Sequence, residues 1–328
     1  MFHRPIFCAA AKYGYNNPNR GLSYEYQTIF KCLSDITDNA HFIDVYQPGG
    51  KELLATSVNQ AATNIDTPKP LVIYIPFTGT LSPIYVRQLR ELAEVGILYL
   101  DDTWRESLVQ SYMEYCDWFT TSDPNYQWRY EGRRATRAKF LPFGFDETSI
   151  SKYSRPFSER DIPVSFIGAR NDFRSYTINT LLKQGIEVQC FGEGWDEGIV
   201  PQERFNEVIG RSKISLNISN SAQWDLNFLM RYPVSILRNI RTDKRIEQFK
   251  ARHLEIAALG ACQLSFYSSG IEKIFKPGND ILIYPTIYEL AYIIKNISST
   301  EVASIAKAGQ RAAKRLGYQS QLQRLIAK

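Results

Sequence analysis

Short apolar runs alternate with amphipathic segments along the whole chain, the pattern of strands and helices in turn. The run PLVIYIPF at 70–77 predicts a buried strand. In SPIYVRQLRELAEVG at 82–96, apolar residues recur three and four apart and Pro83 suits the first turn of a helix. The same pattern predicts a helix over 22–33, strands over 5–13, 41–47 and 97–102, and further elements over 113–123 and 138–144.

The alternation restarts after a polar, irregular segment at 145–161, which is typical of a linker. A long insert separates the strand expected over 213–219 from the helix that begins near 250. In this second half we expect strands over 163–170, 186–195, 261–267 and 280–285, and helices over 175–185, 201–212 and 286–297, followed by a helical tail.

Apolar strands separated by helices indicate a parallel sheet covered on both faces. Two such halves predict an α/β protein of two doubly wound, Rossmann-like domains that face each other across a cleft, with ligands at the carboxyl ends of the strands. The length of 328 residues suits two domains. We expect an acceptor-binding domain over 1–148, a nucleotide-binding domain over 160–305, and helices at 306–328 that pack back toward the first domain.

The amino-acid composition indicates a folded globular protein. The chain is 44% hydrophobic and 22% charged, as in folded globular domains, and it lacks the run of about 18 apolar residues that a membrane span needs. Its start lacks the basic leader and cleavage site of a secretory signal, so we expect a cytoplasmic protein. Five scattered cysteines, three histidines and no Asp-x-Asp motif argue against a disulfide framework or a metal site.

The net charge of +5 is compatible with anionic partners but selects none. A sharper feature is the basic run at 128–139, which fits either a solvated face or a surface that contacts phosphates. Its cations are Arg129, Arg133, Arg134, Arg137 and Lys139.

The loop VSFIGARNDFR in the second half ends a strand at Gly168 and supplies Arg170 and Arg174, four residues apart. If it leads into a helix, both guanidinium groups and the helix N-terminus face one space. Forked donors and a helix N-terminus suit a diphosphate. An ordinary pair of surface arginines is the alternative.

The segment IEQFKARHLEIAALGACQL at 246–264 brings charges to the start of another helix. Arg252 adds a third cation for the same phosphates. Glu255, one turn into the helix, would need hydroxyl donors beside a phosphate site, and a ribose diol supplies them. In the alternative, Glu255 pairs with Arg252 or Lys250 in a helix salt bridge.

The first half is expected to hold the acceptor. Asp101 and Asp102 follow the strand expected over 97–102 and should face the cleft. The loop at 14–26 places Arg20 and Glu25 where they can touch acceptor or donor. Asp102 has a structural alternative, as the cap of the next helix.

Glu247 and Glu255, separated by seven residues and followed by a small-residue run and Gly260, resemble the Glu-x7-Glu signature of GT-B glycosyltransferases. More closely, residues 250–290 resemble the donor-binding half of the CgeB-type, spore-maturation-like glycosyltransferases, and the likeness spans most of 163–297. One departure is Gln248 to Lys250, where the signature has a Pro-Phe-Gly-like turn.

This resemblance implies a GT-B enzyme that uses a nucleotide-diphospho-sugar, a UDP-sugar above all, and needs no further cofactor. Arg170, Arg174 and Arg252 would bind the diphosphate beside Gly168. Glu255 would bind the ribose and Glu247 the donor sugar. The implied acceptor is a bacterial surface glycan or its lipid-linked precursor, which allows peripheral membrane contact.

A more distant resemblance is to phage DNA glucosyltransferases, which carry a similar strand ending in an aspartate base. It implies that Asp102 is the base of an inverting reaction, and that DNA with hydroxymethylated bases is an alternative acceptor. The basic run at 128–139 fits such a nucleic-acid partner. A non-catalytic protein that binds sugar nucleotides is the third hypothesis, because fold does not fix function.

Overall fold

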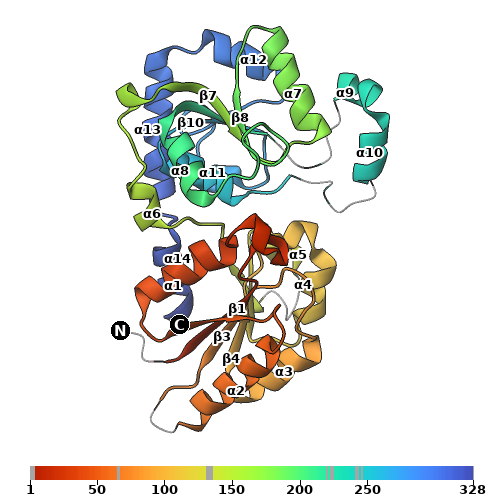
Figure 1. Ribbon diagram of the computed structural model, residues 1–328, viewed down its shortest axis with the longest axis vertical. Helices are drawn as coiled ribbons and strands as arrows, with labels where there is room; N and C mark the ends of the chain where they lie inside the picture. Colours follow the sequence, from red (N-terminus) through yellow and green to blue (C-terminus); the bar gives the residue numbers. More distant parts are fainter. Residues whose placement is uncertain are drawn as a thin grey trace. The chain divides into compact units, whose positions relative to one another are not determined.

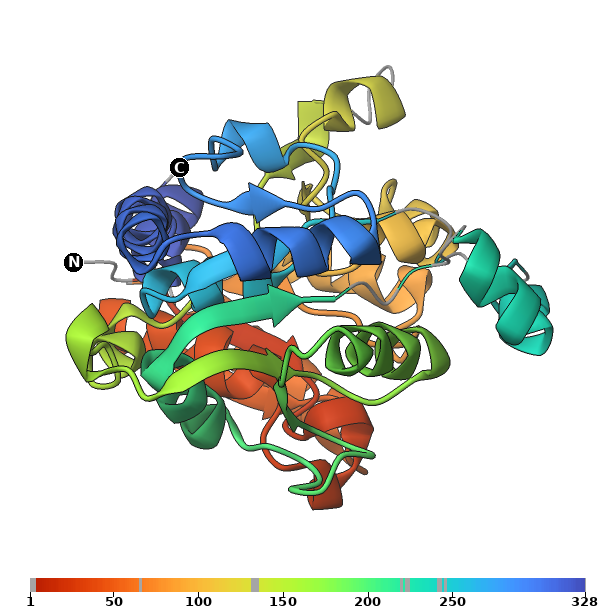
Figure 2. The ribbon, with the colours of Figure 1, turned by 90° about the horizontal axis from the view of Figure 1, so that it is seen from above.

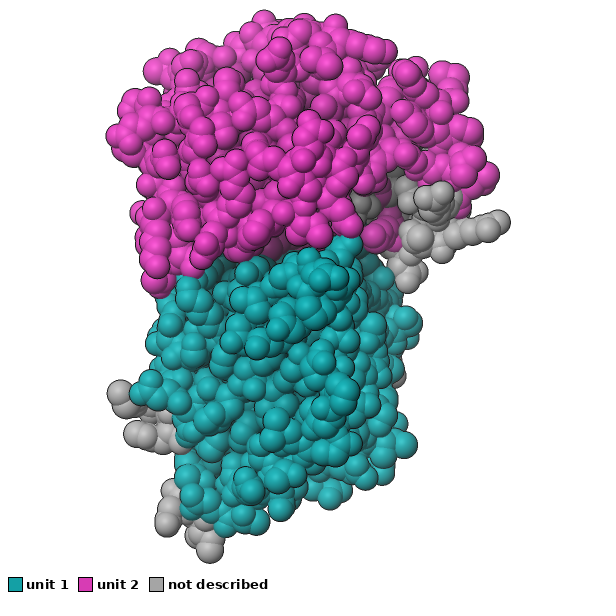
Figure 3. Space-filling view, in the orientation of Figure 1, with its two compact units in different colours: residues 1–146, 317–328 teal, residues 147–316 magenta. Residues whose placement is uncertain are grey.

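The computed structural model describes residues 4–64, 67–130, 136–218, 221, 225–240, 244 and 247–327. The chain forms two compact units, coloured separately in Figure 3. Unit 1 comprises residues 1–146 and 317–328, and unit 2 comprises residues 147–316.

Unit 1 is built on a parallel sheet of six strands in the order β2-β1-β3-β4-β5-β6 (Figure 1). All residues of β1 and β3 are buried, as expected for strands covered on both faces. The strands are β1 (Ile6–Ala10), β2 (Ala40–Asp44), β3 (Leu71–Tyr74), β4 (Glu94–Ile97), β5 (Trp118–Thr121) and β6 (Ala138–Phe140).

The helices of unit 1 include one from the far end of the chain. In this helix, α14, Tyr318 and Leu322 are fully buried in the same core as Ile6 and Cys8 of β1. The helices are η3, a π-helix (Glu25–Phe30), α1 (Lys31–Ile36), α2 (Gly50–Thr63), α3 (Pro83–Leu92), α4 (Glu106–Tyr112), α5 (Tyr126–Arg129) and α14 (Tyr318–Ile326), with short 3-10 turns η1 (Gly14–Asn16), η2 (Pro18–Arg20) and η4 (Asp102–Trp104).

Unit 2 holds a second parallel sheet, in the order β11-β10-β9-β7-β8. Its central strands β9 and β7 consist mostly of buried residues. The strands are β7 (Ile162–Ile167), β8 (Gln189–Phe191), β9 (Ser212–Asn217), β10 (Cys262–Ser265) and β11 (Leu282–Ile283).

Helices cover this sheet, and apolar residues of α7, α12 and α13 share one core with its strands (Figures 1 and 2). Helix α11 packs against α13 and β10. The helices are α6 (Glu147–Ser151), α7 (Asp172–Lys183), α8 (Gln202–Arg211), α9 (Leu226–Arg231), α10 (Pro233–Ile240), α11 (Ala251–Ala258), α12 (Ile287–Asn296) and α13 (Ser299–Lys314), with 3-10 turns η6 (Phe157–Glu159) and η7 (Ile271–Lys273).

Each strand order contains one point where the direction of winding reverses. In unit 2, the chain leaves β7 toward β8 and then returns to place β9 on the other side of β7. In unit 1, the reversal lies between β1 and β3. Loops diverge there, and a crevice at the carboxyl ends of the strands is the usual ligand site of such sheets.

Two segments differ from the predicted pattern. Helix α3 ends at Leu92, so that β4 occupies 94–97 and not 97–102. Gly96 makes this register fit, because a Cβ there would lie 2.0 Å from Trp118 of β5. The insert before 247 contains two helices, α9 and α10, that the apolar pattern did not predict.

Candidate active site

The loop after β7 lies at the winding reversal of unit 2, and it approaches two arginines closely. A Cβ on Gly168 would lie 3.0 Å from Nη1 of Arg252 and 3.3 Å from Nη1 of Arg174. A side chain at position 168 would therefore press on both guanidinium groups, which would have to move by a few tenths of an ångström. The structure brings together these three predicted residues, which come from two separate segments of the chain.

Arg174 belongs to the first turn of α7, whose N-cap is Asn171. Its Nη1 donates to the carbonyl of Ala169 at 2.7 Å and its Nη2 to that of Ile218 at 3.2 Å. The side chain thus joins the loops that follow β7 and β9. Burial lowers the pKa of Arg174 to about 10, and the neighbouring Arg252 contributes to the fall.

Arg252 lies in the first turn of α11, over the ring of Phe205. Within the described part of the chain its guanidinium makes no hydrogen bond, and its Nε is buried without a partner. Burial lowers the pKa of Arg252, and Glu255 opposes this effect. A buried cation usually has a hydrogen-bonded partner, so the geometry leaves room for an anion.

Glu255 sits one turn after Arg252 and is 7% exposed. Its Oε1 accepts a hydrogen bond of 3.1 Å from Nε2 of Gln202, at the start of α8. Burial raises the pKa of Glu255, while Arg252 and Gln202 oppose this rise. Gln202 is a site residue that no sequence motif indicated, because a glutamine at a helix start is common on surfaces.

Glu247 accepts a hydrogen bond of 2.6 Å from the hydroxyl of Ser221. Burial raises its pKa, and Arg174 is among the cations that oppose the rise. The turn that follows is held by His253, whose Nδ1 accepts from the backbone N–H of Lys250 at 3.0 Å. Burial lowers the pKa of His253 to about 3, so the imidazole is neutral at physiological pH.

Arg170, the third predicted cation, has other neighbours. Its guanidinium lies 5.2 Å from the ring centre of Trp195, and its Nε donates to the hydroxyl of Ser175 at 3.0 Å. Trp195 in turn donates from Nε1 to the carbonyl of Gly168 at 2.9 Å. The guanidinium of Arg170 therefore lies against Trp195, which is hydrogen-bonded to Gly168. The guanidinium groups of Arg174 and Arg252 approach Gly168 itself.

Comparisons with known proteins show which family and which folds the chain resembles. Residues 174–327 match the family model described as glycosyl transferase-like. The matched range contains Arg174, Arg252, Glu255 and Glu247 of the candidate site, while Gly168 and Arg170 precede it. A search of curated protein sequences gives no match.

Solved structures share the fold over the whole chain. Sucrose-phosphate synthase from Thermosynechococcus elongatus is 12% identical with a TM-score of 0.59, and 99% of this chain and 98% of that one are covered. HepE from Anabaena, in complex with UDP and glucose, is 13% identical with a TM-score of 0.62 and 99% coverage of both chains. Two parallel-sheet, Rossmann-like units with these neighbours define the GT-B fold.

The protein has the GT-B fold, and its residues 174–327 match a glycosyl transferase-like family. The fold confirms the predicted fold class, and the match over 174–327 supports the predicted type of enzyme.

Unit 1 brings two of its predicted acceptor residues close together. Glu25 begins the π-helix η3, and π-helical turns often mark functional sites. Burial raises the pKa of the Glu25 carboxyl, and Asp101 adds to the rise, whereas Arg105 opposes it. Arg105, which the sequence pattern did not single out, lies over the ring of Phe77 and donates to the carbonyl of Phe77 in the loop after β3.

Arg20 belongs to the loop after β1 and stacks on the ring of Tyr15, 4.8 Å away. Tyr15 and Asn16 both have φ of 54°, which non-glycine residues adopt rarely. Such backbone is frequent at ligand-binding loops. A bridge between Tyr13 and Leu22 closes the loop.

Asp102 is fully buried. It accepts hydrogen bonds from both the backbone N–H and the hydroxyl of Ser122, from the hydroxyl of Thr121 at 2.5 Å and from that of Tyr130 at 3.1 Å. These donors saturate the carboxylate and tie the loop after β4 to the loop after β5. The surroundings of Asp102 favour a structural role. This role is to join two loops and not to cap the next helix.

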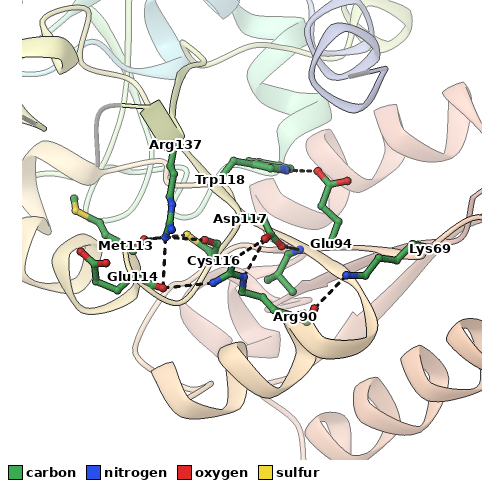
Figure 4. A network of polar contacts seen from close by, with 10 residues as sticks. Lys69, Arg90, Glu94, Met113, Glu114, Cys116, Asp117, Trp118 and Arg137 are labelled. Atoms are coloured by element: carbon green, nitrogen blue, oxygen red, sulfur yellow. Dashed lines mark hydrogen bonds and ion pairs between the residues drawn. The ribbon is translucent and has the colours of Figure 1, made fainter. Parts of the chain in front are cut away.

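The described basic side chains of the run at 128–139 interact with other residues of unit 1. Arg129 forms ion pairs with Asp123 and Glu106. Figure 4 shows Arg137 pointing to backbone carbonyls, which it reaches at 3.2 to 3.5 Å in residues 113, 114 and 116. Lys139 lies over the ring of Trp118. Arg133 and Arg134 lie outside the described residues.

Two further findings concern the described residues alone. They contain no group of three or more His, Cys, Asp or Glu side chains placed to hold a metal ion. No helix among them has the length and apolar content needed to cross a bilayer.

Proposed function

We propose that this protein is a glycosyltransferase that moves a sugar from a UDP-sugar to a hydroxyl acceptor, and that its donor site is the cluster at Gly168 in unit 2. The observation that carries the proposal is the guanidinium of Arg252, which lies beside that of Arg174 and has no hydrogen-bond partner in the described part of the chain. Two such cations side by side repel each other and suit a doubly charged anion.

The diphosphate of the donor fits this need. When the bond from the sugar to the diphosphate breaks, negative charge grows on the leaving phosphate oxygen. The guanidinium groups of Arg174 and Arg252 would stabilise this charge, together with the N-terminus of α7 that follows the Gly168 loop. Arg170 would serve from the edge of the site, where it lies on Trp195.

The two carboxylates would hold the neutral parts of the donor. Glu255, with Gln202 on one oxygen, is placed one turn from Arg252, where it can accept hydrogen bonds from a ribose diol. Glu247 would bind hydroxyls of the sugar. HepE was solved in complex with UDP-glucose, which supports a UDP-sugar as the donor here.

We place the acceptor with Glu25, Asp101 and Arg20 of unit 1. Burial raises the pKa of the Glu25 carboxyl, a shift in the direction that suits a general base. The proposed acceptor is a hydroxyl of a bacterial surface glycan or of its lipid-linked precursor, as the CgeB-type likeness implies. The described members of the basic run are engaged within unit 1, so no structural observation favours DNA as the acceptor.

The test is release of UDP from a panel of UDP-sugars, with and without glycan acceptors. We expect slow hydrolysis of one UDP-sugar and faster release with an acceptor. Replacing Glu247 by Gln should reduce release while UDP still binds. If UDP-sugars bind but no UDP is released under any condition, the chain is a binding protein and the proposal of transfer fails.

A further inference from the structure

Helices α9 and α10 of unit 2 present large apolar side chains to solvent. In α9, Leu226 and Met230 are 74% and 76% exposed. In α10, Val234 and Leu237 are 66% and 63% exposed. Because residues three or four apart lie on the same side of a helix, each helix carries an apolar face that nothing in the described chain covers.

The folding of unit 2 does not account for these four side chains. Another residue, Phe228, anchors α9 with 1% exposure, and its ring packs edge-on against Phe173 at 5.1 Å. Tyr232, between the two helices, stacks on Phe228 at 5.2 Å and also meets Tyr176 of α7. The inward side of α9 is therefore packed against unit 2, and the exposed apolar side chains of α9 and α10 are left without a partner in the described chain.

The charge of the segment indicates the kind of partner. Residues 226–245 contain five Lys and Arg and a single acidic residue, Asp243, so their net charge is +4. Arg231 and Lys244 are exposed. Exposed apolar side chains among basic residues are typical of segments that lie in the interface of an anionic membrane. An ordinary protein interface has no need of such an excess of one charge.

The segment that contains α9 and α10 begins and ends beside Glu247 of the candidate donor site. The chain leaves the carboxyl end of β9, passes through α9 and α10, and returns at Glu247. The hydrogen bond of 2.6 Å between Ser221 and Glu247 joins the two ends of this excursion. Figures 1 and 2 show both helices standing away from the sheet of unit 2.

We propose that α9 and α10 adsorb to the surface of a bilayer that contains anionic phospholipid. The four apolar side chains enter the boundary between headgroups and acyl chains, and the exposed Arg231 and Lys244 remain among the phosphates. The proposal does not depend on the transfer reaction, because it rests on exposure and charge alone.

Co-sedimentation with vesicles tests it. The full chain is mixed with vesicles of phosphatidylglycerol and phosphatidylcholine, or of phosphatidylcholine alone, at about 0.15 M salt. We expect binding to the anionic vesicles only. Leu226→Ser with Met230→Ser should weaken it roughly tenfold, as should Arg231→Glu with Lys244→Glu. The matched control is Leu53→Ser with Ile84→Ser in α2 and α3, side chains 56% and 59% exposed, which should bind as the wild type does.

Three results would overturn the proposal: equal binding to neutral vesicles, no binding to anionic ones, or an equal loss in the control. A lipid-free dimer that Leu226→Ser with Met230→Ser converts to a monomer would instead assign the face to a second copy of the chain. UDP affinity is measured in every variant. It should stay unchanged, so that a failure of membrane binding is distinguishable from a failure of the donor site.

Discussion

Buried arginines lie at both edges of the sheet in unit 2, and they differ in what surrounds them. At the amino edge, Arg160 is 4% exposed and burial lowers its pKa to about 10, as for Arg174 at the other edge. Its guanidinium donates to four backbone carbonyls, those of Arg155, Ile209, Ser212 and Leu259, at 2.7 to 3.2 Å. These contacts tie the segment at 155–160 to the ends of α8 and α11.

At the carboxyl edge, Arg252 has no such partners in the described chain and lies next to a second cation at Gly168. A lowered pKa alone therefore does not identify a binding site, since both arginines show one. The distinguishing features are the lack of acceptors and the neighbouring like charge. Stability should depend on Arg160, and anion binding on Arg252.

The largest effect on stability is expected for Arg160→Met. The variant leaves several buried carbonyls without a donor, so the free energy of unfolding should fall by about 4 kcal/mol. Chemical denaturation measures this change. UDP affinity should be retained wherever the variant is folded, and a loss of affinity greater than the loss of folded protein would break the comparison.

Acid should weaken the wild type through His253. The pKa of this imidazole is about 3 in the folded protein and near 6.5 in the unfolded chain, so stability from the neutral ring is full above pH 6.5 and is lost as the pH falls toward 3. At pH 4 the loss is roughly 3 kcal/mol. In His253→Asn, the fall in unfolding free energy between pH 7 and pH 4 should be smaller than in the wild type. Equal slopes would contradict the buried, neutral state.

In unit 1, Asp102→Asn tests whether a buried carboxylate has a structural or a catalytic role. The amide loses charge-assisted acceptors for Thr121, Ser122 and Tyr130, and we expect a loss of about 2 kcal/mol in stability. Turnover per folded molecule should change little. An unaltered melting curve with abolished turnover would restore Asp102 as the catalytic base.

The smallest effect concerns Glu255→Gln. UDP affinity should fall about tenfold, because the ribose loses a charged acceptor. Burial raises the pKa of Glu255, so its charged form costs stability as the pH rises above 4.5. The variant should thus be at least as stable as the wild type at pH 7, with a difference that disappears below pH 4.5. A variant that is less stable at pH 7 would indicate a structural ion pair with Arg252.

The apolar pattern was sufficient to predict the two-unit α/β fold, because fully buried parallel strands such as β1 and β3 leave continuous apolar runs. It misplaced β4, since residues 94–100 are apolar enough to extend a helix or a strand, and only the contact of Gly96 with Trp118 fixes the register. Asp101 and Asp102 consequently lie four and five residues beyond the strand and not at its end. That shift is why Asp102 joins two loops.

The cluster that we propose as the donor site was partly predictable for a similar reason. Residues at strand ends and helix starts are brought to one edge by the topology, which places Gly168, Arg174 and Arg252 together. Gln202 and Ser221 could not be found this way, because their roles follow from the tertiary positions of Glu255 and Glu247. Which arginines donate hydrogen bonds to backbone carbonyls is also invisible in the sequence.

The most direct test of the central claim is calorimetric titration of UDP into Arg252→Met, with Arg160→Met as the matched buried arginine. We predict that Arg252→Met weakens UDP binding by at least a factor of about 100, while its unfolding free energy changes by less than about 1 kcal/mol. Wild-type affinity for UDP in folded Arg252→Met would contradict the assignment of the anion site to the Gly168 edge.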